Sequence, residues 1–201
     1  MKFLRKTIRE QIDFLLNQNK FLETFHNHLL FLTVFTKENL EEENIDFDER
    51  NKVINLIKDN QWITPTAKEF RNEIVNSKHS KMLTPYSESE LKQMKLFKLK
   101  DYHIGYALKK KNGKFSEIVS VFNNEPNIKN IGIELVQNAV KNGGCYLDHF
   151  DGFLTDLYSK LGFVETNRIP YNSKYDKNNE FQNKYGKQDI IYRIHKSCLE
   201  K

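Results

Sequence analysis

The sequence predicts an α+β protein in which helices come first and strands alternate with helices afterwards. From Phe3 to Leu32, apolar residues recur at three- and four-residue steps, which is the spacing of amphipathic helices. After Pro85 the pattern changes to short runs rich in aromatic and β-branched residues, which favour strands. From residue 100 onward we expect the order strand, strand, helix, strand, helix, strand, long loop and strand.

Two more helices are expected before residue 80. An acidic stretch from Glu38 to Glu49 interrupts the apolar spacing, which resumes from Asn51 to Lys58. Thr64-Pro65 then indicates a helix start, with the threonine as N-cap and the proline at the first helical position. This helix should run to about Lys78.

Residues 102–122 are predicted to form an antiparallel hairpin. Tyr102 to Leu108 and Phe115 to Phe122 have the composition of strands, and Asn112-Gly113 between them is a strong signal for a tight turn. Leu96 to Leu99 is a weaker candidate for a strand that leads into this hairpin.

The change of pattern divides the chain into a helical N-terminal region, residues 1–83, and a second domain, residues 84–201. The N-terminal helices are either an extension or the early helices of that domain's fold. In the second domain we expect two helices, each ended by glycine, and three further strands. The helices are expected over residues 131–141 and 154–161, and the strands over residues 145–150, 163–169 and 190–195. Residues 171–187 are expected to form a long polar, aromatic-rich loop.

The composition suggests an anionic partner and an intracellular setting. The chain has 201 residues and a net charge of +5, and residues 96–201 hold 17 basic against 12 acidic residues, so they carry the whole excess. A phosphorylated cofactor or nucleic acid would suit this charge, and so would a plain bias toward lysine. Cys145 and Cys198 cannot form a disulfide framework, so we expect a reducing, cytoplasmic environment and a buried structural thiol at Cys145. No apolar run is long enough to span a membrane.

The segment from Val121 to Leu135 has the organisation of a phosphate-binding loop. A strand ends, small polar residues follow, and a helix begins near Gly132. Backbone N–H groups and the positive end of a helix can hold a phosphate at such a junction. A plain turn before a helix would give the same pattern.

A second junction carries a resemblance to a known family. Tyr158-x-x-x-Gly162-Phe163 resembles the C-terminal signature of the GNAT family of N-acetyltransferases. The segment Asn127 to Gly132 occupies the position of that family's pyrophosphate loop. The resemblance covers residues 84–195 and is closer still to a divergent group of phage and prophage GNAT-like proteins. The motifs shared with that group are Gly105-Tyr-Ala, Ile118 to Phe122, Gly143-Gly144, Leu147 to Gly152, Arg168-Ile-Pro-Tyr171 and Tyr185-Gly-x-x-Asp189.

This resemblance implies a mixed central sheet flanked by helices, with two parallel strands splayed apart near Phe122 and Tyr146. It implies acetyl-CoA as co-substrate and an amine of a protein or small molecule as acceptor, which attacks the thioester directly. A backbone N–H between Ser120 and Asn123 would polarise the carbonyl, and Tyr158 would act as general acid. The residues expected to bind the co-substrate are Phe122, Asn123, Asn127, Lys129, Asn130, Ile131, Gly132 and Ile133.

The acceptor amine must lose a proton, and four residues are candidates for the base. These are Asp148, His149, Asp151 and Glu117. His149 has a suitable intrinsic pKa, and Asp148 and Asp151 bracket the end of the predicted strand. The carboxylates could instead cap the helix that starts at Gly152. We expect no metal site, because these residues lack a second cluster of ligands and because His26 and His28 face different sides of a helix.

Two alternatives to an acetyltransferase stay open. The loop departs from the family pattern, with Asn at positions 127 and 130, which favours a catalytically inactive GNAT-like protein that binds a partner, such as one in phage–host interaction. The tyrosines and lysines of residues 171–187 suit single-stranded nucleic acid or a lid over the acceptor. The expected setting is the cytoplasm of a bacterium or a phage-infected bacterium.

Overall fold

A computed structural model describes residues 46–176 and 179–199. The apolar pattern between Phe3 and Leu32, including His26 and His28, lies outside the described residues. The chain divides after Glu42, and residues 43–201 form one compact unit.

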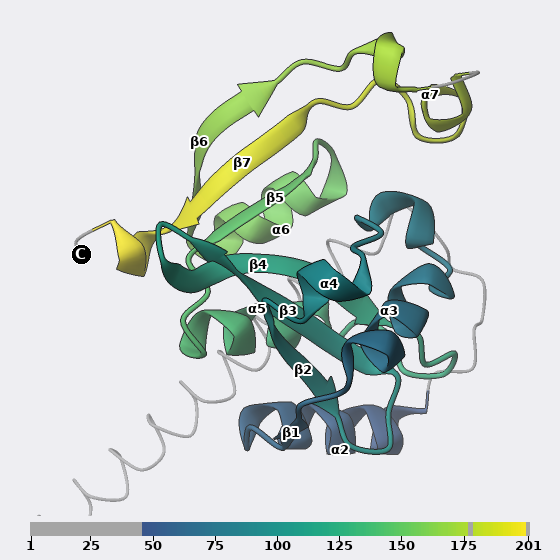
Figure 1. The fold of residues 1–201 in the computed structure, drawn as a ribbon, viewed down its shortest axis with the longest axis vertical. Helices are drawn as coiled ribbons and strands as arrows, with labels where there is room; N and C mark the ends of the chain where they lie inside the picture. The colour runs from purple at the N-terminus through teal and green to yellow at the C-terminus, as the bar shows by residue number, and fades with distance from the viewer. Residues whose placement is uncertain (1–45, 177–178, 200–201) are drawn as a thin grey trace, which may run out of the picture. The chain divides into compact units, whose positions relative to one another are not determined.

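A seven-stranded sheet is the centre of this unit, in the spatial order β1-β2-β3-β4-β5-β7-β6 (Figure 1). Every neighbouring pair is antiparallel except β4 and β5, which are parallel. The strands are β1 (Trp62–Ile63), β2 (Lys95–Leu99), β3 (Ile104–Lys111), β4 (Lys114–Asn123), β5 (Tyr146–Phe150), β6 (Phe163–Ile169) and β7 (Ile190–His195).

Helices cover both faces of the sheet (Figure 1). One apolar core joins α2 and α5 to β3 and β4, and a smaller one joins α3 and α4 to the opposite face. The helices are α2 (Phe47–Lys58), α3 (Ala67–Val75), α4 (Glu88–Leu91), α5 (Gly132–Lys141), α6 (Phe153–Lys160) and α7 (Glu180–Tyr185). Short 3-10 turns are η1 (Ser80–Met82), η2 (Ser173–Tyr175) and η4 (Lys196–Cys198). The α+β class is therefore confirmed, and so is the order of elements after residue 100, except that the loop expected over residues 171–187 contains η2 and helix α7.

The boundary of the sheet-containing unit lies well before residue 83. Strand β1 joins the sheet by pairing with β2, and α2 packs on α5. A polar network makes the same connection, since buried Asn138 of α5 donates to the carbonyl oxygen of Ile57 at 2.8 Å and accepts from Tyr106 Oη at 2.8 Å. Residues 47–83 thus belong with the sheet and are not part of a separate helical region.

Helix α3 begins later than the sequence predicts. Its N-cap is Thr66, whose hydroxyl accepts from Glu69 N, while the Glu69 carboxylate accepts from Thr66 N at 2.8 Å. This reciprocal capping box outcompetes the predicted start at Thr64-Pro65.

The two cysteines form a disulfide between the start of β5 and the C-terminal turn η4. Cys145 and Cys198 are 53 positions apart, and their Cα atoms lie 5.8 Å from each other. The expectation of a buried, unpaired thiol at Cys145 was therefore wrong, because tertiary structure brings the C-terminus beside β5. Within residues 46–176 and 179–199, no helix has the length and apolar character needed to cross a membrane.

Candidate functional site

The two parallel strands meet at one point and then separate. Glu117 of β4 pairs with Tyr146 of β5, and Cys145 N donates to the carbonyl oxygen of Ser116 at 2.7 Å just before it. No further residue pair joins the described strands, although β4 continues to Asn123 and β5 to Phe150. The part of β4 after Glu117 therefore faces β5 without a continuous ladder of hydrogen bonds.

A β-bulge at Ser120 lies on this separated part of β4. The register with β3 shifts between Gly105 and Ala107, and Ser120 adopts a left-handed backbone with φ of 52°. Its side chain is buried, and its Oγ has no hydrogen-bond partner among the residues that the structure describes. A strained residue with an unpaired buried hydroxyl is a feature of functional sites, and the sequence gives no signal for it because serine seldom adopts this conformation.

The loop between β4 and α5 is held from within by an asparagine. Asn123 Nδ2 donates to the carbonyl oxygen of Ile128 at 2.5 Å, and Asn123 Oδ1 accepts from Glu125 N at 3.1 Å. Ile128 and Ile131 anchor the loop in the core. Phe122 is also buried, with its ring 5.3 Å from that of Phe70. Phe122, Asn123 and Ile131 were expected to bind the co-substrate. In the structure their side chains make contacts within the protein that hold the loop in its conformation.

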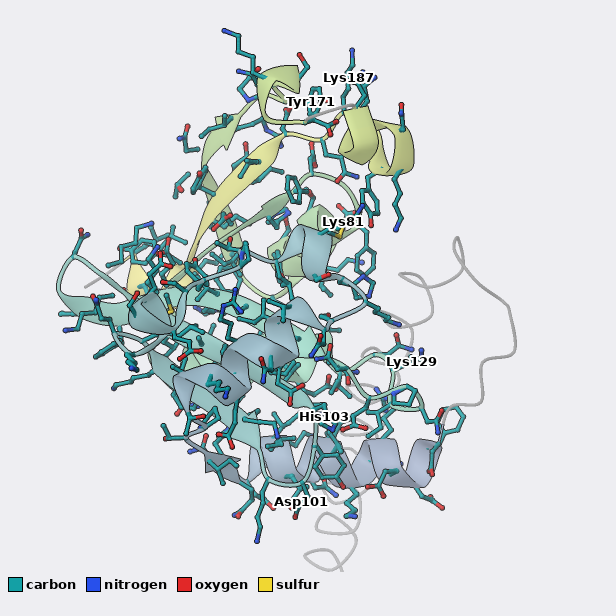
Figure 2. All side chains as sticks on the ribbon, turned by 45° about the vertical axis from the view of Figure 1, so that its right-hand side comes forward. Lys81, Asp101, His103, Lys129, Tyr171 and Lys187 are labelled. Atoms are coloured by element: carbon teal, nitrogen blue, oxygen red, sulfur yellow. A yellow bond between two sulfur atoms is a disulfide. The ribbon has the colours of Figure 1, made fainter. Side chains whose placement is uncertain are left out.

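Arg50 of α2 holds the same loop from outside. Its Nε and Nη2 donate to the carbonyl oxygens of Lys129 and Asn130, both at 3.1 Å. Because C=O and N–H point in opposite directions across a trans peptide, the N–H groups of Asn130 and Ile131 face away from Arg50. Figure 2 shows Lys129 on this loop, far from Tyr171 and Lys187 at the other end of the view. Arg50 lies 79 positions from Lys129, and sequence reasoning missed it.

Asn130 fits the position that the GNAT family pattern gives to glycine. Its φ is 61°, in the left-handed region that asparagine tolerates better than most residues. The departure from the family pattern therefore leaves the shape of the loop intact.

The start of α5 is open to a ligand. Helices α2, α3 and α4 are capped by the side chains of Asp46, Thr66 and Ser87, whereas α5 has no side-chain cap. A Cβ atom at Gly132 would meet no atom within 4 Å. N–H groups at a helix start that the N-cap side chain leaves unengaged suit a phosphate, although the first turn of α5 also holds the carboxylate of Glu134, which hydrogen-bonds its own backbone N–H. Asn127, Lys129, Gly132 and Ile133 lie on this loop or the first turn of α5.

Tyr158 has the properties of a hydroxyl reserved for a ligand. Its ring packs edge-on against His149 and Phe163, with centroids 5.0 and 5.9 Å away. Its hydroxyl makes no hydrogen bond to any residue that the structure describes. Burial, together with the negative charge of Asp148, raises the pKa of Tyr158 to about 12.

Asp148 is the candidate base whose carboxylate remains available. Within the described part of the chain it forms no ion pair, and part of its surface is exposed. Surrounding protein atoms and the neighbouring carboxylate of Glu117 raise the pKa of Asp148 above its usual value. The negative charge of Asp148 also contributes to the raised pKa of Tyr158. Tyr158 packs on His149, the neighbour of Asp148 on β5.

His149 is fixed in a structural role. It is buried, its Nδ1 lies 2.7 Å from the carbonyl oxygen of Phe150, and its Nε2 accepts from Arg193 Nε at 2.9 Å. Burial lowers its pKa. With both ring nitrogens engaged, the imidazole has no free lone pair for an acceptor proton.

Asp151 is also fully engaged. Its carboxylate accepts from Thr155 Oγ at 2.7 Å and Gly152 N at 2.9 Å, and pairs with Arg168 at 2.5 Å. These contacts, the threonine first, lower the pKa of Asp151. Arg168 also pairs with Asp189 at 3.3 Å, so three of the resemblance motifs meet at the base of the 170–189 segment. Asp151 contacts Thr155 in the first turn of α6, but within the described residues its carboxylate accepts no N–H of that turn, so it does not cap the helix as the alternative proposed.

Two further observations complete the description of the site. Within residues 46–176 and 179–199, no three His, Cys, Asp or Glu side chains are grouped so that they could hold a metal ion. Comparison of the chain with models of protein families, with curated proteins and with solved structures found no match.

Proposed function

We propose that the protein is an acyl-CoA-dependent N-acyltransferase of the GNAT type. The observation that carries the proposal is the separation of β4 and β5, the one parallel pair of the sheet, beside the bulge at Ser120. The resemblance implies a parallel pair that splays apart to admit acetyl-CoA. The strand order and the predicted positions of Tyr158 and Gly132 support the same assignment.

The loop before α5 is suited to the pyrophosphate of the co-substrate. The N–H groups of Asn130 and Ile131, turned away from Arg50, and the uncapped start of α5 can donate to phosphate oxygens. Lys129 adds a positive charge on the same loop.

The chemistry requires three tasks of the chain. Asp148 accepts the proton that the acceptor ammonium loses, a backbone N–H of β4 near Ser120 donates to the thioester oxygen, and Tyr158 donates to the sulfur. The C–N bond forms as the C–S bond breaks, and the leaving thiolate takes a proton.

The pKa of Tyr158 limits how this proton moves. A phenol at about 12 is a weaker acid than a thiol at about 8.5, so complete transfer is unfavourable in water. In the same poorly solvated place the pKa of the CoA thiol is also raised, which reduces the difference between the pKa values of the thiol and the phenol. We therefore assign Tyr158 hydrogen-bond donation to the developing thiolate, followed by proton transfer.

Calorimetric titration with acetyl-CoA tests the proposal, and Gly132 offers a matched pair of variants. Gly132→Ala adds a methyl group into open space and should leave binding nearly unchanged, whereas Gly132→Arg fills the space before α5 and should abolish it. Micromolar binding, lost only in Gly132→Arg, supports the assignment. No binding at millimolar ligand rejects it and favours the partner-binding alternative.

A further inference from the structure

Two lysines of β3 share one carboxylate near the point where β4 and β5 meet. Lys109 Nζ and Lys111 Nζ each lie 3.8 Å from a carboxylate oxygen of Glu117, whose side chain is only 18 % exposed. The lysine side chains are 44 % and 37 % exposed. The cluster therefore offers two ammonium groups to solvent against one carboxylate.

Aromatic rings hold both ammonium groups in place. Lys109 Nζ lies 5.4 Å from the ring centroid of Tyr86, and Lys111 Nζ lies 4.4 Å from that of Tyr146. Such contacts restrict long side chains and keep their charge at the surface. Tyr146 is also the residue that pairs with Glu117 across β4 and β5.

The lysine cluster lies on the same side of the sheet as Asp148. Tyr146 and Asp148 are two residues apart on β5, so their side chains share one face and lie about 7 Å apart along the strand. The charges of Lys111 and Lys109 act on the Asp148 carboxyl. An acceptor whose amine reaches Asp148 thus meets two ammonium groups on the same face of the sheet.

We infer that the acceptor is an amine that also carries an anionic group, a carboxylate or a phosphate, which binds Lys109 and Lys111. This inference rests on the proposed function. Glu117 balances one of the two lysine charges, and the carboxylate of Asp148 faces the acceptor ammonium. The anion would therefore approach a site with one lysine charge in excess, whereas the second ammonium of a polyamine would be repelled. The free anionic amine and an acidic peptide bearing a lysine share this chemistry.

The same hairpin supplies a matched control. Lys95 and Lys110 lie over the ring of Phe115, with Nζ 5.0 and 5.1 Å from its centroid. Phe115 packs on the core beneath α2 and α5, so this pair lies on the opposite face. Lys95→Gln/Lys110→Gln therefore removes the same charge as Lys109→Gln/Lys111→Gln while leaving the proposed anion site intact.

The assay measures release of the CoA thiol with 4-aminobutanoate and butylamine, which differ by one carboxylate. Three further acceptors are tested. O-phosphoethanolamine and an acidic peptide with one lysine distinguish a small anionic amine from a peptide, and spermidine tests a polyamine. We expect the Lys109/Lys111 variant to raise KM for the anionic amines roughly 3- to 10-fold more than KM for butylamine, as two exposed ion pairs would, because any effect of the lost charges on Asp148 is common to all amines. The Lys95/Lys110 variant should change neither.

The inference would be overturned if the two double variants raised KM for the anionic amines equally. It would also be overturned if the wild type used spermidine better than the anionic amines. Acetyl-CoA titration is run on each variant in parallel. Binding without selectivity for anionic amines rejects the acceptor class alone, whereas absence of acetyl-CoA binding in the wild type rejects the proposed function and the inference with it.

Discussion

Asp148 and Tyr158 differ from His149 and Asp151 in one physical respect, although all four lie within eleven residues. The first two make no described hydrogen bond or ion pair through their reactive atoms, and their pKa values are raised. The second two are saturated by contacts to Arg193, Thr155 and Arg168, and their pKa values are lowered. Residue type made the other three candidates for proton transfer, and the family resemblance added Tyr158. The proposed function assigns proton transfer only to the two residues whose reactive atoms are not engaged by other described residues.

The largest expected effect is on turnover in Tyr158→Phe. The ring would keep its contacts with His149 and Phe163, so the variant should fold, but the donor to the leaving thiolate would be absent. We expect kcat for CoA release to fall roughly 10²- to 10⁴-fold with acetyl-CoA affinity retained. Steady-state kinetics and calorimetry measure the two quantities. A variant with wild-type kcat would remove Tyr158 from the mechanism.

The next effect concerns the disulfide that joins the residue before β5 to the turn η4. Cys145→Ser removes the disulfide that closes a 53-residue segment, and the loop-entropy model gives a loss of about 4 kcal/mol in the free energy of unfolding. Urea unfolding with and without dithiothreitol measures it. The reductant should destabilise the wild type and leave Cys145→Ser unchanged, and an unmoved wild-type midpoint would show that the disulfide does not form.

Replacement of each carboxylate by an amide tests the comparison directly. Asp148→Asn should lower kcat/KM about 10²-fold at neutral pH and remove the acidic limb of its pH profile, because the base is lost. Asp151→Asn should leave kcat/KM within a factor of about two, because that carboxylate is already engaged by Thr155, Gly152 and Arg168. A larger loss of activity in Asp151→Asn would reverse the assignment.

Local sequence signals predicted most elements of the sheet domain. Asn112-Gly113 gave the hairpin, since both residues tolerate the positive φ that the turn needs, and these angles are 52° and 79°. The predicted helix over residues 131–141 is observed as Gly132–Lys141. Strand β1 was not predicted, because a strand of two residues is too short to show the alternation of apolar and polar residues. The start of α3 was misplaced because the Thr66 and Glu69 capping box competes with a proline signal.

The candidate site could be predicted only where its residues lie close together in the sequence. Gly132 and Tyr158 belong to short motifs, whereas the brace from Arg50 and the disulfide join segments 79 and 53 positions apart. The saturation of His149 depends on Arg193, which reaches it from another strand. A sequence pattern does not show contacts between distant segments. The chemistry of the residues could therefore identify candidate residues, but not which of them are already engaged in the folded protein.

Arg50 should affect binding and not turnover. Arg50→Gln frees the carbonyl oxygens of Lys129 and Asn130, so the loop N–H groups lose their fixed direction. We expect Kd for acetyl-CoA to rise about 10-fold, equivalent to one or two hydrogen bonds, with kcat at saturation unchanged. Hydrogen exchange of residues 130–133 in the free protein should accelerate. Unchanged exchange would show that Arg50 does not hold the loop.

The smallest effect is on the pH dependence of stability, which should have opposite signs for Asp148 and Asp151. The pKa of Asp151 is lowered in the folded state, so its carboxylate stabilises the fold above its unfolded pKa, near 3.9, and this stabilisation is lost as the pH falls through the folded pKa. The pKa of Asp148 is raised, so its ionised form weakens the fold, and the protein regains stability as the pH falls through that pKa. At pH 7, Asp151→Asn should therefore reduce the free energy of unfolding by less than about 1 kcal/mol, as for other exposed pairs, whereas Asp148→Asn should increase it slightly. Urea midpoints measured from pH 7 to pH 3 should bring both variants toward the wild type from opposite sides, and two variants that deviate in the same direction would mean that Asp148 is as well satisfied as Asp151.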